Sequence, residues 1–79
     1  MLIYPNPTNG LLNIEFTSET YQDIQISIIN MVGKHIAVDY NSSIGENYTQ
    51  IDLTSKAQGV YVVEIKTDNG IIRKRIVLQ

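Results

Sequence analysis

The sequence predicts an all-β fold in which two antiparallel sheets pack face to face. Apolar residues recur at every second position in several short segments, which is the period of a strand with one buried face. About seven such segments follow one another, and turn-forming residues separate them at the short, regular spacing typical of a β-sandwich. No segment repeats its apolar residues with the period of a packed helix.

The second predicted strand illustrates the pattern, because Leu12, Ile14 and Phe16 alternate with polar neighbours and therefore share one face. The last predicted strand differs from it, since basic residues interrupt the apolar ones. In chain order, the predicted strands occupy residues 2–4, 12–16, 24–28, 36–40, 51–53, 61–65 and 71–78.

The stretch from Pro5 to Gly10 ends the first predicted strand. Pro5 and Pro7 have fixed φ angles and no amide donor, so they stop strand pairing and pass the chain rigidly into the turn that ends at Gly10. We expect the chain to cross between sheets or edges there. Turn geometry alone accounts for Pro5, Asn6, Pro7 and Gly10, and recognition by a partner is a second interpretation.

Asn69 and Gly70 predict a tight hairpin near the end of the chain. Both residues tolerate the positive φ that a type I′ turn requires, so residues 60–67 and 71–78 are predicted to pair as antiparallel strands. The other predicted breaks are turns at Gly33 and Gly45 and one helical turn within residues 53–59.

Tyr61 follows Gly59 by two residues, at the start of the sixth predicted strand. In immunoglobulin-like sandwiches, a tyrosine at this place turns its hydroxyl back onto the upstream backbone and pins the corner between the sheets. The alternative is a core aromatic residue whose hydroxyl reaches the surface. Both interpretations make Tyr61 structural, and the first favours an immunoglobulin-like sandwich.

Composition excludes several classes of function. A chain of 79 residues forms one small domain, and a net charge of −2 is not the basic footprint of a nucleic-acid-binding protein. Cysteine is absent, which excludes disulfides and thiolate metal sites. No apolar run is long enough for a membrane-spanning helix, so direct membrane insertion is not expected.

Catalytic residues do not form a recognisable set. His35 is the single histidine, and its neighbours Lys34 and Ile36 indicate a solvated strand position rather than a metal ligand or a proton relay. The nucleophile-elbow motif of hydrolases is missing, and so small a domain leaves little room for a pocket. We therefore expect no enzyme activity and no cofactor.

Four short motifs follow one another along the whole chain: Tyr4–Gly10, Asn30–Gly33, Gly59–Tyr61 and Lys74–Val77. Each motif alone is common, but their order and spacing resemble the C-terminal sorting domains, type A, of the type IX secretion system. Asn30 and Gly33 correspond to the central asparagine-to-glycine turn of that family, and Gly59 with Tyr61 to its glycine-x-tyrosine. The resemblance covers residues 1–79 as a single C-terminal sorting domain, excised from a larger secreted protein.

The resemblance implies a seven-stranded immunoglobulin-like fold that directs an N-terminal cargo protein across the outer membrane of certain Gram-negative bacteria. It further implies transit through the periplasm, recognition of the folded tail by the translocon and its outer-membrane shuttle protein, and removal by a surface sortase. The cargo would end at the cell surface or outside the cell.

Three of the six basic residues cluster in the last predicted strand, where strict alternation places Lys74 on the apolar face. One interpretation is protection of a sheet edge against aggregation, and a bulge near Lys74 could also turn this side chain outward. The other interpretation is a docking strand for the translocon, by strand addition with charge steering. The proposed recognition residues are Arg73, Lys74, Arg75, Ile76, Val77, Leu78 and Gln79.

Two rival functions use the same fold. A small carbohydrate-binding or adhesive module would stack sugars on exposed aromatic side chains, for which Tyr21, Tyr40 and Tyr48 are the candidates near loops and strand ends. The absence of tryptophan weighs against this rival. A mechanical spacer would require similar domains on both sides.

Overall fold

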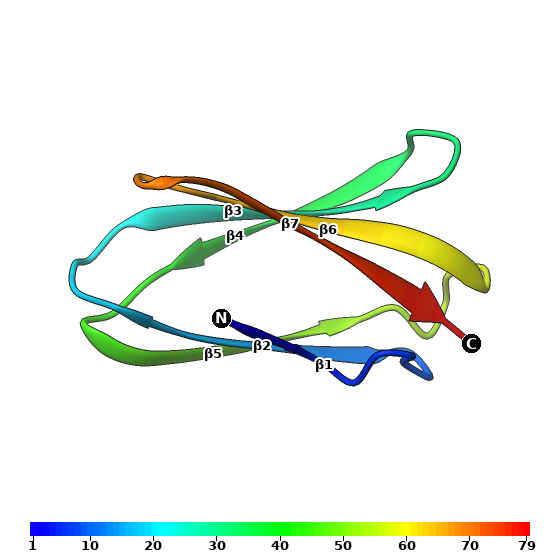
Figure 1. The fold of residues 1–79 in the computed structure, drawn as a ribbon, viewed down its shortest axis with the longest axis horizontal. Coiled ribbons are helices and arrows are strands. Elements are labelled where there is room, and N and C mark those ends of the chain that lie inside the picture. Colours follow the sequence, from blue (N-terminus) through cyan, green and yellow to red (C-terminus); the bar gives the residue numbers. More distant parts are fainter.

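The computed structural model describes residues 1–79 and contains seven strands and no helix (Figure 1). Five of the strands have eight or nine residues, whereas the first has only three. The strands are β1 (Leu2–Tyr4), β2 (Leu11–Ser18), β3 (Asp23–Asn30), β4 (His35–Asn41), β5 (Gly45–Asp52), β6 (Gly59–Thr67) and β7 (Gly70–Leu78).

The strands form two antiparallel sheets that lie one above the other (Figure 1). The first sheet has the order β1-β2-β5, and the second has the order β4-β3-β6-β7. Every pairing between neighbouring strands is antiparallel. This architecture confirms the predicted sandwich, and it is consistent with an immunoglobulin-like fold. No helix has the length and hydrophobicity needed to cross a bilayer.

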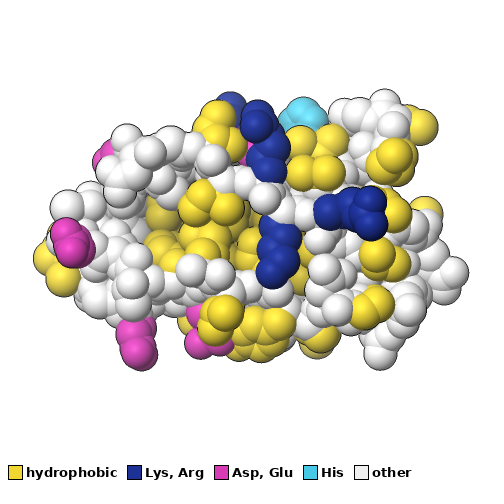
Figure 2. All heavy atoms as spheres, in the orientation of Figure 1, with side chains coloured by type: hydrophobic (Ala, Val, Ile, Leu, Met, Phe, Trp, Pro, Cys, Tyr) yellow, Lys and Arg dark blue, Asp and Glu magenta, His cyan; other side chains and the backbone are white.

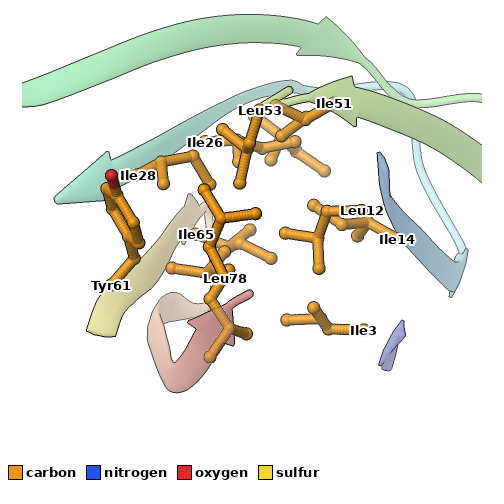
Figure 3. Close-up of a cluster of buried hydrophobic side chains, with 13 residues drawn as sticks. Ile3, Leu12, Ile14, Ile26, Ile28, Ile51, Leu53, Tyr61, Ile65 and Leu78 are labelled. Atoms are coloured by element: carbon orange, nitrogen blue, oxygen red, sulfur yellow. The ribbon is translucent and has the colours of Figure 1, made fainter. Parts of the chain in front are cut away.

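Inward-facing residues of both sheets form one continuous core (Figure 3). Figure 3 places Leu12 and Ile14 opposite Ile65, with the side chains of the two sheets pointing toward one another. The alternation that predicted the strands therefore also predicts the buried face. The core residues are Ile3, Leu12, Ile14, Ile24, Ile26, Ile28, Ile51, Leu53, Tyr61, Val63, Ile65, Ile76 and Leu78.

The segment between β5 and β6 differs from the prediction. Strand β5 begins at Gly45 and ends before Leu53, so it lies earlier than the predicted strand. The predicted helical turn is wrong: residues 53–58 form only turns and bends, with one bond from the Lys56 amide to the Leu53 carbonyl (2.9 Å). Leu53 follows the end of β5. It is fully buried and belongs to the core.

The hairpin between β6 and β7 is confirmed, but its turn is not type I′. Thr67 pairs with Gly70, so the central residues of the turn are Asp68 and Asn69. Gly70 has a φ of +131°, whereas no residue other than glycine has a positive φ. Side chains hold this turn instead, since the Asn69 amide donates to the Thr67 hydroxyl (3.1 Å).

Hydrophobic matching does not distinguish this register from that of a turn centred on Asn69 and Gly70, because the two differ by two residues and keep the same side chains facing inward. The observed pairing sets Lys74 opposite the buried Val63, whereas the other would set it opposite the buried Ile65. The Thr67 hydroxyl supports the observed turn, since it accepts from the Asn69 amide and donates to the Gly70 carbonyl (3.3 Å).

Tyr61 forms the predicted corner. Its ring is buried, with 7% of its surface exposed, and its hydroxyl donates to the Ala57 carbonyl four residues upstream (2.5 Å). The bond fastens the segment that leaves β5 to the start of β6. The first of the two interpretations of Tyr61 is therefore confirmed.

Candidate functional site

The last strand, β7, has two unlike faces. Its register with β6 is continuous from Gly59–Leu78 to Thr67–Gly70, so no bulge interrupts it. The predicted bulge near Lys74 is therefore wrong. Alternation then places the even-numbered residues of β7 toward the first sheet and the odd-numbered ones on the outer surface of the sandwich.

The inward face of β7 is covered only over its second half. Ile76 and Leu78 are 0% and 3% exposed and belong to the core, with Ile3 of β1 nearby (Figure 3). Ile72 is 43% exposed, and Lys74 is exposed although its partner Val63 is fully buried. Strand β1 has only three residues, so the first sheet does not extend over this part of β7.

The outward face of β7 carries Arg73, Arg75 and Val77. Arg73 forms an ion pair with Glu64 on β6 (Nε to Oε2, 2.8 Å), while no ion pair holds Arg75. Surface ion pairs of this kind contribute little to stability, so the pair acts mainly to neutralise Arg73 locally. Arg75 is therefore the free basic group on this face.

Apolar side chains continue the outward face across the neighbouring strands. Strand pairing places Val77 opposite Val60, Arg75 opposite Val62, and Val62 opposite Ile29. These four apolar residues are half-buried. We call this surface the outer patch, and it consists of Ile29, Val60, Val62, Arg73, Arg75 and Val77.

The edge of β7 is fastened by the loop that follows β1. Asn6 donates from Nδ2 to the Arg75 carbonyl (3.1 Å) and accepts from the Val77 amide at Oδ1 (3.0 Å). The Thr8 amide donates to the Val77 carbonyl, and the Gln79 amide donates to the Thr8 carbonyl, both at 2.8 Å. Asn6 and Thr8 form this N-terminal clamp, which occupies the edge where strand addition along residues 75–79 would have to occur.

The turn behind the clamp depends on Thr8 and Gly10. Thr8 is fully buried, and its hydroxyl donates to the Leu11 carbonyl (2.7 Å) and accepts from the Gly10 amide (3.1 Å). Both peptide bonds before Pro5 and Pro7 are cis. The bonds of Thr8 and the positive φ of Gly10 (+143°) agree with the turn-geometry interpretation, and recognition of this loop by a partner stays a prediction.

The clamp yields a prediction for Asn6. Replacement by alanine removes both bonds to β7, and we expect it to lower the free energy of unfolding by about 1–2 kcal/mol. Replacement by aspartate keeps the acceptor for the Val77 amide but loses the donor to Arg75, so about half of that loss is expected. Urea unfolding and hydrogen exchange at the Val77 amide measure both effects. Equal Val77 exchange in wild type and Asn6→Ala would contradict the clamp.

The Asn30 turn is closed by its own side chain. Asn30 Oδ1 accepts from the amides of Val32 (3.1 Å) and Lys34 (2.9 Å), and Gly33 supplies a φ of +88°. These bonds explain why an asparagine and a glycine stand three residues apart. The Asn30 turn and the hairpin turn at Asn69 and Gly70 both have structural roles, and none of their residues belongs to the outer patch.

The three tyrosines proposed from sequence, Tyr21, Tyr40 and Tyr48, do not come together as the aromatic platform of a carbohydrate-binding module. Tyr40 is half-buried, packs edge-on against Phe16 (ring centroids 5.7 Å apart) and donates to Asn47 (3.1 Å). Tyr21 lies in the loop between β2 and β3, apart from Tyr48 on the outer surface of the first sheet. The three candidates thus occupy three different surroundings.

Tyr4 and Glu15 are coupled on the outer surface of the first sheet. The Tyr4 hydroxyl donates to the Glu15 carboxylate, and this bond raises the pKa of Tyr4 to about 12. The negative charge of Glu15 disfavours the phenolate, so the tyrosine remains a neutral donor at physiological pH. The pair ties β1 to β2 rather than presenting a reactive group.

No three histidine or acidic residues gather as a metal would require. His35 is exposed at the start of β4, as expected for a solvated strand position.

Sequence reasoning missed Thr8 and the apolar half of the outer patch. The signal for the patch was present, because Val60, Val62 and Val63 flank Tyr61 in an apolar run that does not alternate. A run of this kind indicates a strand with apolar residues on both faces. Thr8 carried no signal, since its partners lie at the far end of the chain.

Comparison with known protein families matches residues 2–79 to the family described as the secretion system C-terminal sorting domain. A search of curated proteins finds no match. The family match covers essentially the whole chain and agrees with the motifs from Tyr4 to Val77. The chain therefore belongs to the C-terminal sorting domains of the type IX secretion system, which mark proteins for export to the cell surface or the extracellular space.

Proposed function

We propose that this domain is recognised in its folded state, through the outer patch, by the type IX translocon or its outer-membrane shuttle protein. The observation that carries the proposal is the division of β7 into two faces. Ile76 and Leu78 are core residues, so a partner cannot reach them without unfolding the domain. Arg75 and Val77 point outward from the same strand and remain available.

The chemistry of the outer patch specifies the kind of partner surface. Half-buried valine and isoleucine side chains offer an apolar contact, and the unpaired Arg75 offers a guanidinium that binds carboxylates with directional hydrogen bonds. An apolar surface with an acidic rim is complementary to it. Lys74 faces the other way and is not part of this contact, and Ile76 and Leu78 lie in the core. Of the seven recognition residues predicted from sequence, Arg73, Arg75 and Val77 belong to the outer patch, and Gln79 is exposed beyond the end of β7.

The cargo precedes this domain in the polypeptide and reaches the periplasm with its own entry signal. A surface sortase then removes the domain after the cargo has crossed the outer membrane. The family match supports this order of events only as far as export itself. The domain needs no cofactor for such a role, and a sorting signal is not catalytic in itself.

Charge reversal at Arg75 tests the outer patch. Residues 1–79 are fused to a periplasm-targeted reporter in a host with a type IX system, and surface delivery is measured. Arg75→Glu is expected to reduce delivery at least about tenfold, because it removes the free cation of the patch and repels an acidic partner. The matched control is Lys34→Glu, an equal charge change on an exposed residue of the β3–β4 turn.

Both purified variants should unfold at the urea concentration of the wild type, since both side chains are exposed and form no ion pair. With folding intact, unchanged delivery of Arg75→Glu would rule out the outer patch as the docking surface. A wild-type fusion that stays in the periplasm would rule out the sorting function of residues 1–79.

A further inference from the structure

The first sheet is shorter than the second along the side where β1 faces β7, because β1 has only three residues. Strand β5 pairs with β2 along its whole length, up to Gly45 opposite Ser18. Strand β1 pairs with β2 only from Asn13 to Glu15. Residues 16–18 of β2 therefore have a strand partner on one side only, and their other edge is bare.

A groove of about 700 Å³ lies between this bare edge and the uncovered half of β7. Four of its twelve lining residues are apolar, Met1, Phe16, Ile24 and Ile72, and the polar ones come from residues 17–22 and 67–69. Met1 and Ile72 are 47% and 43% exposed, so the groove leaves large apolar side chains in water. Figure 2 shows apolar side chains within a hollow between the two sheets, close to where Figure 1 marks the N-terminus.

A second, smaller hollow of about 250 Å³ also borders Met1, and its lining includes Leu2, Glu15, Thr17 and Glu46. Leu2 and Glu15 are paired across β1 and β2, on the outer surface of the first sheet. The space ahead of Met1 is thus flanked by one hollow between the sheets and one on the outer surface of the first sheet, each lined by both apolar and polar residues. A strand whose side chains alternate inward and outward fits both.

We propose that the polypeptide joined to the amino group of Met1 continues β1 along the bare edge of β2 and fills the groove. The β1–β2 register, with Leu2 opposite Glu15, sets the pairing. Met1 comes opposite Phe16, the residue before it opposite Thr17, and the second residue before it opposite Ser18. Alternation turns the first of these two added residues outward and the second inward, toward Ile72.

The polypeptide joined to Met1 fits the bare edge of β2 better than a strand from another molecule does. Met1 already lies at the end of the β1–β2 ladder, so a strand from another molecule would have to end abruptly against it. The chain that leads into Met1 continues the existing pairing without such a junction. The proposal rests on the proposed function only in requiring a polypeptide ahead of a C-terminal domain.

The consequence concerns the boundary between cargo and domain. The two residues before Met1 become part of the sandwich, and an apolar side chain at the second packs on Ile72. A protease that separates cargo from domain must then cut further upstream or first strip this strand from β2.

The test extends the chain at its N-terminus by Thr-Val-Thr, which places valine at the inward position and threonine at the outward one. The matched control is Thr-Asp-Thr, of equal length, with a carboxylate directed into the groove, which holds Ile72 and the acidic Glu19 and Asp68. Amide exchange of residues 16–18 is followed by NMR in both extended chains and in the 79-residue chain. We expect at least one of these amides to exchange about tenfold more slowly in the valine chain only.

Equal exchange at residues 16–18 in all three chains would overturn the proposal, as would equal protection by the valine and aspartate extensions. Extended chains that remain folded are recognised by unchanged exchange at the core strands β3 and β6. The measurement uses no export machinery, so its failure is separate from failure of the sorting function. Loss of export in the Arg75 variant likewise leaves this proposal untouched.

Discussion

Replacing Ile76 by alanine is expected to lower the free energy of unfolding by about 2–5 kcal/mol, because the side chain is fully buried between the sheets. A domain of this length has a total stability of about 4–12 kcal/mol, so the loss is a large share of it. Leu78→Ala should have a similar cost, since only 3% of Leu78 is exposed. Urea unfolding of the purified domain measures both.

Val77 is the matched control, since it lies between these two residues and faces the outer patch half-buried. Val77→Ala should cost less than about 1.5 kcal/mol. Comparable losses at positions 76, 77 and 78 would contradict the division of β7 into a core face and a docking face.

The same division governs how truncations of the tail are interpreted. Deleting residues 76–79 removes two core side chains and the bond between Gln79 and Thr8. Export would then fail because the domain unfolds, whether or not the partner contacts those residues. Substitutions on the outer patch separate recognition from folding, and a deletion of the tail does not.

Gly10→Ala is the second large effect, with an expected loss of about 2–4 kcal/mol in the free energy of unfolding. Gly10 has a φ of +143°, and a β-carbon there would lie 2.4 Å from the Thr54 methyl carbon and 3.1 Å from the Thr54 Cα. The backbone of Thr54 cannot move freely, because the neighbouring Leu53 amide donates to the Gly10 carbonyl (2.6 Å). Backbone strain at the positive φ and overpacking against Thr54 therefore both contribute to the loss in the free energy of unfolding.

Gly33→Ala separates the two terms. Gly33 also has a positive φ, of +88°, but a β-carbon there meets nothing within 4 Å. Only the cost of placing alanine at a positive φ remains, which is about 1–2 kcal/mol in the free energy of unfolding. Equal losses in the two variants, measured by urea unfolding, would show that the contact with Thr54 has no effect.

Much of the fold was predictable because strand formation here depends on local pattern. The sequence pattern located six of the strands and only the end of β5, which was expected at residues 51–53 and runs from Gly45 to Asp52, while the spacing of Gly59 and Tyr61 located the corner. The turn at Asn69 and Gly70 was misassigned because its sequence favours type I′, whereas Thr67 pairs with Gly70 and its hydroxyl bonds to the Asn69 amide and the Gly70 carbonyl. The preference of two turn residues did not reveal these bonds from a third.

The candidate site was less predictable, because the two bonds that Asn6 forms with β7, to Arg75 and to Val77, join distant parts of the chain. Asn6 and Val77 are 71 positions apart, and no local pattern links an asparagine in a proline-rich turn to the edge of the last strand. Lys74 presents the same difficulty. Alternation correctly placed it on the inward face but could not tell that no strand lies above it.

The sequence by itself determined which residues form strands and which of them share a face, because side chains alternate along an extended backbone whatever surrounds it. Tertiary structure alone decided which faces are covered, since coverage depends on the length and position of the opposing strand. With β1 limited to three residues, half of β7 is sealed in the core and half remains open.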